Sequence, residues 1–237
     1  MAILTELRDT TGLLTIDRRE KANAYDRAHL DQLREGLDAL AAVARVIVIC
    51  SAGDRAFCAG ADLSELHAAD PLDALDLRSQ RVFNHLAALP VPSIAAVQGP
   101  AVAGGCELTL ACDLRIVGPN ARFSLPETAL GLIPSAGGCT RLTRLIGPSR
   151  AKQVILAGAS LDAETAVASG LALALAPDPL AAALTLAATL AKRDGVAMRL
   201  AKQIIDAGED RASLDAERVS EALLYARRRA RASAADR

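Results

Sequence analysis

Two loops of small residues are the first features of this sequence whose residue types suggest chemistry. One reads FCAGAD at 57–62 and the other AGGCE at 103–107. Each follows an apolar run typical of a buried strand, so each is expected to turn from a strand into a helix. Backbone N–H groups at a helix start lack an intrahelical partner and can receive a developing negative oxygen. The glycines could also serve only tight turns and close packing, but the occurrence of two such loops favours an anion site.

Glu107 is the candidate acid–base residue beside the second loop. It follows Gly104 by three positions, so on a helix the two residues share a face and the Glu side chain leans toward the N-terminal end. The residues at 106, 108, 110 and 111 are apolar, and an ionised carboxylate is costly in such a setting unless it is paired or used. The pattern therefore predicts a functional carboxylate next to the N–H donors.

Glu127 is a weaker candidate on its own residues. It follows FSLP at 123–126, and a Pro-Glu pair is common at the start of a helix or turn, where the carboxylate interacts with the helix dipole. Asp62 has a similar structural interpretation, as a cap of the next short helix. Without other information, neither residue would be assigned chemistry.

Other reaction classes find little support. Neither loop matches G-x-x-x-x-G-K-[ST] or a strict G-x-G-x-x-G, which disfavours nucleotide binding, and the chain contains no G-x-S-x-G. His29, His67 and His85 lie far apart in the sequence, so they suggest neither a metal site nor a catalytic triad. The five cysteines occur singly without CxxC spacing and are expected to be reduced and packed. The sequence thus predicts no metal and no bound cofactor.

The elements that position these residues are predicted to form an α/β body followed by helices. Strands are expected at 2–7, 12–17, 45–50, 93–97 and 114–118, and helices at 26–42, 75–89 and from the second loop to about 112. From about 140 the pattern is wholly helical, with segments near 140–146, 149–157, 162–169, 179–193, 195–207 and 213–229. We therefore divide the chain into an α/β core at 1–178 and a helical C-terminal region at 179–237.

Composition and charge limit the class of protein. The 237 residues are 51% hydrophobic and 2% aromatic, which fits an aliphatic globular core, and the formal net charge is -1. No overall field favours nucleic acid or a membrane surface, and the basic end RRRARASAADR is expected to be a solvated tail. Glu6 and Arg8 interrupt the first apolar run, so we expect no signal peptide, no membrane span and a cytoplasmic protein.

Five segments together resemble the crotonase, or enoyl-CoA hydratase/isomerase, superfamily. They occur in family order across almost the whole α/β body, although Arg19 stands where many members have proline. The segments are DRREKANA at 17–24, RAFCAGADL at 55–63, QGPAVAGGCEL at 98–108, ARFSLPE at 121–127 and GLIPSAGGCTRL at 131–142.

The resemblance implies an α/β fold in which repeated ββα units form a spiral, with a C-terminal helical region that assembles a homotrimer or a dimer of trimers. It implies that the amides of Ala61 and Gly104 bind the thioester oxygen of an acyl-CoA, and that Glu107 and Glu127 are the acid–base pair. Contacts with the coenzyme A thioester are expected at Lys21, Ala22, Ala24, Ala59, Gly60, Ala61, Asp62, Leu63, Gly105, Pro134 and Gly138.

The activity implied first is hydration of a 2-enoyl-CoA to a 3-hydroxyacyl-CoA, since both glutamates are present. An isomerase that converts 3-enoyl-CoA to 2-enoyl-CoA is an alternative and would need only Glu127. Another crotonase-type lyase or hydrolase would share the same oxyanion site. A noncatalytic protein that binds coenzyme A and serves in assembly is the alternative from a different class, because a fold does not fix a function.

Overall fold

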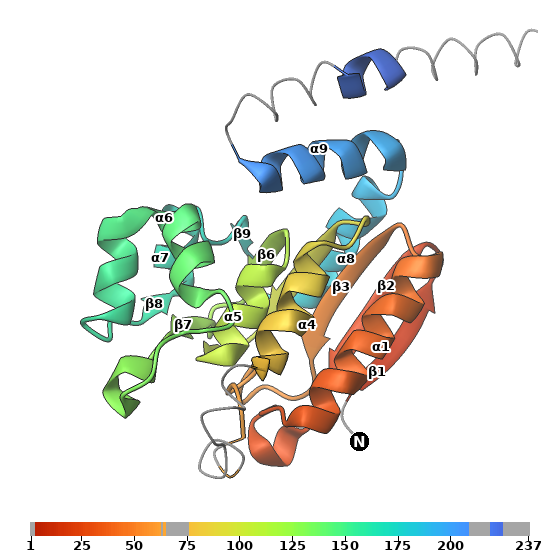
Figure 1. Ribbon diagram of the computed structural model, residues 1–237. Helices are drawn as coiled ribbons and strands as arrows, with labels where there is room; N and C mark the ends of the chain where they lie inside the picture. Colours follow the sequence, from red (N-terminus) through yellow and green to blue (C-terminus); the bar gives the residue numbers. More distant parts are fainter. Residues whose placement is uncertain (1–2, 63, 65–75, 209–218, 225–237) are drawn as a thin grey trace, which may run out of the picture.

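A six-stranded sheet forms the centre of the molecule (Figure 1). The computed structural model describes residues 3–62, 64, 76–208 and 219–224. The strand order is β1-β2-β3-β4-β6-β9; the first two strands are antiparallel and the others pair in parallel. The β-branched run in β3 is buried, as expected of a central parallel strand. The strands are β1 (Ile3–Arg8), β2 (Thr11–Ile16), β3 (Val46–Ser51), β4 (Ser93–Val97), β6 (Leu114–Val117) and β9 (Ala174–Leu175).

A second, smaller sheet contains β5 (Pro100–Val102), β7 (Arg122–Ser124) and β8 (Leu161–Asp162). Two isolated parallel bridges add earlier segments of the chain to this arrangement. Cys58 pairs with Ala101 of β5, and Tyr25 pairs with Ala61. The chain thus repeatedly passes from the large sheet to the small one and then into a helix. This is the ββα repeat that the resemblance implied.

Helices cover both faces of the large sheet. On one face lie α1 (Arg27–Val43), α4 (Arg78–Ala87) and α5 (Gly104–Ala111), and on the other lies α8 (Pro179–Leu190) (Figure 1). In α1, Leu30, Leu33, Leu37 and Leu40 are buried, and their spacing of three or four places them on the face toward the sheet. In α8, alanines at 183 and 187 pack against the opposite face.

The part of the chain after residue 140 is not wholly helical, so that prediction was wrong. It holds α6 (Gly138–Ile155), α7 (Ala163–Ala168), α8 and α9 (Gly195–Ala207), but also the short strands β8 and β9. Strands of two residues are too short to show an alternating pattern, and they form because β7 and β6 offer them free edges. The expected break at Gly147-Pro148 is present, since Gly147 has a φ of 78° inside α6.

The last helices extend beyond the sheet. In α9, Lys202 places its Nζ 2.9 Å from the carboxylate of Asp113, but no residue of this helix is buried. Of the helix expected at 213–229, only residues 219–224 lie in the described part, and they are helical. No helix among the described residues combines the length and apolar composition needed to cross a bilayer.

Candidate active site

The two loops of small residues lie against each other. A side chain at Gly60 would come within 3.1 Å of the amide nitrogen of Gly104, and the φ of Gly60, +94°, is one that residues with side chains rarely adopt. Ala61 forms an isolated bridge with Tyr25. Within the described residues, the amide N–H groups of Ala61 and Gly104 have no acceptor. The sequence therefore brings two free donors together, as the oxyanion hypothesis requires.

Close packing explains why glycine occupies 104 and 105. A side chain at Gly104 would collide with the hydroxyl of Tyr25, and one at Gly105 would collide with the backbone oxygen of Cys58. The first residues of α5 can therefore approach the neighbouring chain only without a Cβ atom. For Gly105, a predicted contact of the thioester, the structure shows this packing role.

Tyr25 lies beside both donors, because it bridges with Ala61 and its hydroxyl fills the space next to Gly104. Its ring meets Phe83 edge-on with centroids 5.9 Å apart, and only 9% of the residue is exposed. Burial, with smaller contributions from Cys58 and Glu107, raises the pKa of Tyr25 well above its ordinary value. The phenol therefore stays neutral beside the carboxylates and can act only as a hydrogen-bonding group.

Glu107 lies in α5, whose residues are all buried, and is 4% exposed. Its Oε1 accepts hydrogen bonds from the amides of Ala136 at 2.7 Å and Gly138 at 2.9 Å. Burial raises the pKa of Glu107, while these two amides and the charge of Arg141 lower it. The carboxylate is thus held by the turn at 134–138, not only placed near the start of its own helix as the sequence suggested. Two amides that hold one oxygen favour the ionised form.

The turn at 134–138 depends on two glycines and on the side chain of Arg141. Gly137 has a φ of +109°, and a Cβ atom at Gly138 would lie 3.0 Å from Oε1 of Glu107. Arg141 donates from one nitrogen to the oxygen of Ala136 at 2.9 Å and from another to Oδ1 of Asn84 at 2.7 Å. The turn is therefore held in a shape that directs its amides to the carboxylate of Glu107.

Glu127 is the first residue of the 3-10 helix η2 (Glu127–Leu130) and is half-buried. Its Oε2 is buried without a hydrogen-bond partner in the described part of the chain. Burial, and then the charge of Glu107, raises its pKa from 4.5 to about 7. Burial, and then the charges of Glu107 and Glu127, raise the pKa of the Cys139 thiol, so both carboxyls lie near this residue. The two carboxyls thus interact electrostatically but have unlike environments, a difference by which one could act as base and the other as acid.

The segment expected to hold the coenzyme joins the first loop. After the 3-10 helix η1 (Arg19–Lys21), Ala22 and Asn23 adopt positive φ angles of 51° and 58°, and the amide of Ala59 donates to the oxygen of Ala22 at 3.1 Å. Segments 21–24 and 59–62, which the resemblance assigned to the same ligand, are therefore adjacent.

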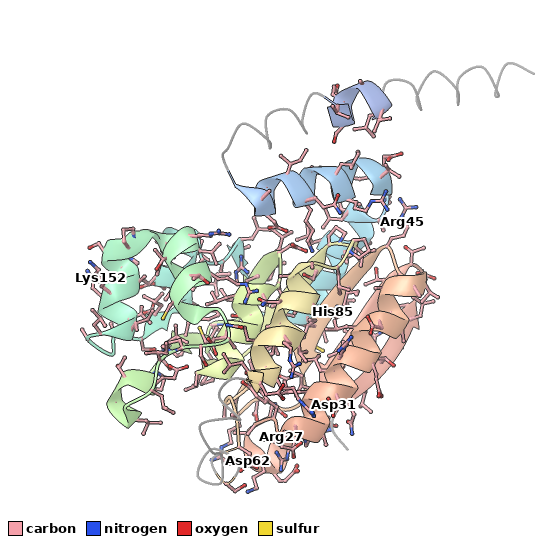
Figure 2. All side chains as sticks on the ribbon, viewed as in Figure 1. Arg27, Asp31, Arg45, Asp62, His85 and Lys152 are labelled. Atoms are coloured by element: carbon pink, nitrogen blue, oxygen red, sulfur yellow. The ribbon has the colours of Figure 1, made fainter. Side chains whose placement is uncertain are left out.

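Asp62 connects these two segments electrostatically. Its Oδ2 lies 3.1 Å from Arg18 and 3.9 Å from Nζ of the half-exposed Lys21, and its Oδ1 accepts from the amide and hydroxyl of Ser64. The hydrogen bonds of Ser64, then the nearby cations, lower the pKa of Asp62. Figure 2 places Asp62 at the end of the view where α1 begins and Arg45 at the other end.

Comparisons with known proteins decide the family. Residues 6–233 match the family described as Enoyl-CoA hydratase/isomerase. The chain belongs to this family. A 2,3-dehydroadipyl-CoA hydratase of Escherichia coli is 40% identical over 196 residues, which are 81% of this chain and 77% of the relative. A probable enoyl-CoA hydratase, echA8, of Mycobacterium tuberculosis is 36% identical over 231 residues, which are 95% of this chain and 87% of the relative.

Solved structures confirm the fold. An enoyl-CoA hydratase from Bacillus anthracis superposes with a TM-score of 0.88 at 33% identity, covering 93% of this chain and 90% of that one. Pseudomonas aeruginosa DspI gives a TM-score of 0.89 at 36% identity, covering 94% and 95%. The chain therefore has the crotonase-like α/β fold that the resemblance implied.

The structure of this family member gathers most of the predicted site residues and adds others. Ala61, Gly104, Glu107 and Glu127 surround one region, and Gly138 contacts Glu107 directly. Leu63 and the segment 65–75 lie outside the described residues. Sequence reasoning missed Tyr25, Asn84, Ala136 and Arg141. Arg141 lies within the matched segment 131–142, but an arginine on a helix usually indicates a solvated face, so its residue type alone gave no signal.

Proposed function

We propose that this protein adds water across a 2-enoyl-CoA thioester to give a 3-hydroxyacyl-CoA. One observation carries the proposal: Glu107 and Glu127 have different environments at one site. Glu107 has two amide donors, whereas a buried oxygen of Glu127 has none in the described part of the chain. Hydration needs a base for the water and an acid for the α-carbon, and such a pair supplies both.

The two free amides support the charge that develops in this reaction. When hydroxide adds to the β-carbon, electrons move through the α-carbon to the thioester oxygen. Donors at Ala61 and Gly104 would stabilise that oxygen without reorganising. Removing one such donor typically costs about 10²- to 10³-fold in rate, so the hole is one of the larger contributions to catalysis.

The glutamates then move the protons. Glu107 takes a proton from the attacking water, whose oxygen bonds to the β-carbon, and Glu127 gives its proton to the α-carbon. Each turnover thus leaves Glu107 protonated and Glu127 ionised, and one proton must return from the first carboxyl to the second. Because their charges interact, the pair is best described as sharing one proton with apparent pKa values of its own.

Coenzyme A is proposed to bind along segments 21–24 and 59–62. Lys21 is half-exposed, with its Nζ 3.9 Å from Asp62, and can offer a cation to a phosphate. Water is the second substrate, so the reaction needs no cofactor. A homotrimer or dimer of trimers and a cytoplasmic location also remain proposals, supported by the family resemblance.

The experiment is a panel of enoyl-CoA thioesters with products identified by mass spectrometry. It should include crotonyl-CoA, longer enoyl chains and 2,3-dehydroadipyl-CoA, which the name of the E. coli relative specifies. Glu107→Gln and Glu127→Gln should each lose most activity, whereas Glu164→Gln, on the exposed side of α7, should keep it.

Two outcomes would contradict the proposal. Conversion of a 3-enoyl-CoA to a 2-enoyl-CoA that survives Glu107→Ala would identify an isomerase that uses Glu127 alone. Saturable binding of acyl-CoA with no turnover across the panel would identify a noncatalytic coenzyme A binder.

A further inference from the structure

One peptide group in the turn at 134–138 is held at both ends by side chains. Nε2 of Gln80 donates to the oxygen of Ser135 at 2.7 Å, and the N–H of Ala136 donates to Oε1 of Glu107 at 2.7 Å. That oxygen and that N–H belong to the same planar trans peptide, so they point in opposite directions. We infer that Gln80 is a positioning residue for Glu107 and acts through this peptide group. The inference rests on the proposed function, in which Glu107 is the base.

Helix α4 presents two polar residues to this turn. Gln80 and Asn84 are four positions apart and share a face of the helix. Gln80 holds the oxygen of Ser135 directly, and Asn84 binds Arg141, which holds the oxygen of Ala136. Two consecutive carbonyls are thus fixed from outside the turn. The amides of the turn are left to face Glu107.

The Gln80 hydrogen bond should also strengthen the bond to Glu107. A donor at a carbonyl polarises the peptide and makes its N–H a better donor, by about 10–30% for each bond in a chain. Without Gln80 the peptide can tilt, and the oxygen of Ser135 loses the side chain that fixes it. The amide of Ala136 lowers the pKa of Glu107. A weaker amide bond would therefore raise that pKa and make the base less available near neutral pH.

The charged and titratable groups near Glu107 lie outside α4. They are Arg141 and Cys139 of α6, Glu127 of η2, Cys106 of α5 and Tyr25 before α1. The ionisable residues of α4 form ion pairs with other residues: Arg78 with Asp31, Arg81 with Asp76 and His85 with Asp38. Figure 2 labels His85 and Asp31 on the side of α1 and α4. The link from Gln80 to the turn is a neutral hydrogen bond, which a substitution can remove without changing the local charge.

The test compares two substitutions at Gln80 that should act in opposite ways. Gln80→Met keeps length and removes the donor, so kcat for an enoyl-CoA should fall about two- to tenfold. The acid limb of the kcat/KM profile should move to higher pH by about half a unit. Gln80→Lys restores a donor to the oxygen of Ser135, so its acid limb should not move to higher pH. Gln153→Met makes the same change at an exposed glutamine of α6 and should alter neither quantity.

A second readout does not depend on turnover. The carboxyl carbon of Glu107 can be followed by NMR in protein labelled with ¹³C-glutamate and assigned by its loss in Glu107→Gln. Its titration should move to higher pH in Gln80→Met and stay with the wild type in Gln153→Met. An unchanged titration in Gln80→Met would overturn the inference, even if activity fell. If the titration moves but the wild-type protein hydrates no enoyl-CoA, the positioning role stands and the proposed function fails.

Discussion

Gly138→Ala tests whether the turn at 134–138 sets the position of the Glu107 carboxylate. A Cβ atom at this position would lie 2.5 Å from Cβ of Pro134 and 3.0 Å from Oε1 of Glu107. Ordinary contacts begin at 3.4 Å, and the ring of Pro134 cannot swing away from its own backbone. The added methyl group therefore has to push the turn and the carboxylate apart.

The size of the effect follows from the hydrogen bond at risk. The amide of Gly138 donates to Oε1 of Glu107 at 2.9 Å, and a hydrogen bond to a charged group contributes about 1.5–3 kcal/mol. If the bond is lost in the transition state, the rate falls roughly 10- to 150-fold. Overpacking should also cost about 1–3 kcal/mol of stability.

The assay is the loss of enoyl thioester absorbance under saturating substrate, together with a thermal melt followed by circular dichroism. Gly195→Ala is the matched control, because the nearest atom to its Cβ is a flexible Arg45 nitrogen at 3.7 Å and alanine suits the first turn of α9. It should keep both kcat and melting temperature. A folded Gly138→Ala protein with the same kcat as this control would refute the claim that the turn at 134–138 positions Glu107.

Three further results are expected. The kcat/KM profile of the wild type should fall as pH rises through about 7, where Glu127 loses its proton, and Glu127→Gln should abolish that limb together with most of the activity. Glu127→Gln should have a higher melting temperature than the wild type above pH 7 and the same melting temperature below pH 4.5. The raised pKa of Glu127 makes the wild-type folded state lose stability as pH rises from 4.5 to about 7, and glutamine does not titrate. Equal melting temperatures at all pH values would contradict the raised pKa. Arg141→Gln should move the acid limb of the profile to higher pH, because the charge that lowers the pKa of Glu107 is gone, while Arg144→Gln, an exposed change on the same helix, should leave the limb in place.

The sequence predicted the body of the fold and much of the site for identifiable reasons. The buried run in β3 and the leucine spacing in α1 are strong periodic signals. The two loops could be recognised because glycine is required where backbones approach closely, as Gly60 does to Gly104. The interpretation of Glu107 rested on the cost of an ionised group among apolar neighbours, and its burial agrees with that.

The features that sequence reasoning missed depend on contacts between distant segments. β8 and β9 exist because neighbouring strands offer edges, and a pair of residues carries no period. The amides that hold Glu107 come from residues 29 and 31 positions later in the chain, and backbone groups leave no mark on residue type. The role proposed for Glu127 came from the resemblance alone, and the structure adds an observation that supports it: a buried carboxyl oxygen without a partner among the described residues.

The most direct test of the central claim is incorporation of oxygen-18 from labelled water. Purified protein is incubated with a 2-enoyl-CoA that it turns over, and the product is analysed by mass spectrometry with Glu127→Gln as the inactive comparison. The paired roles of Glu107 and Glu127 predict a 3-hydroxyacyl-CoA that carries one labelled oxygen at the β-carbon. A product that carries no label, or label acquired equally with Glu127→Gln, would contradict hydration by this pair.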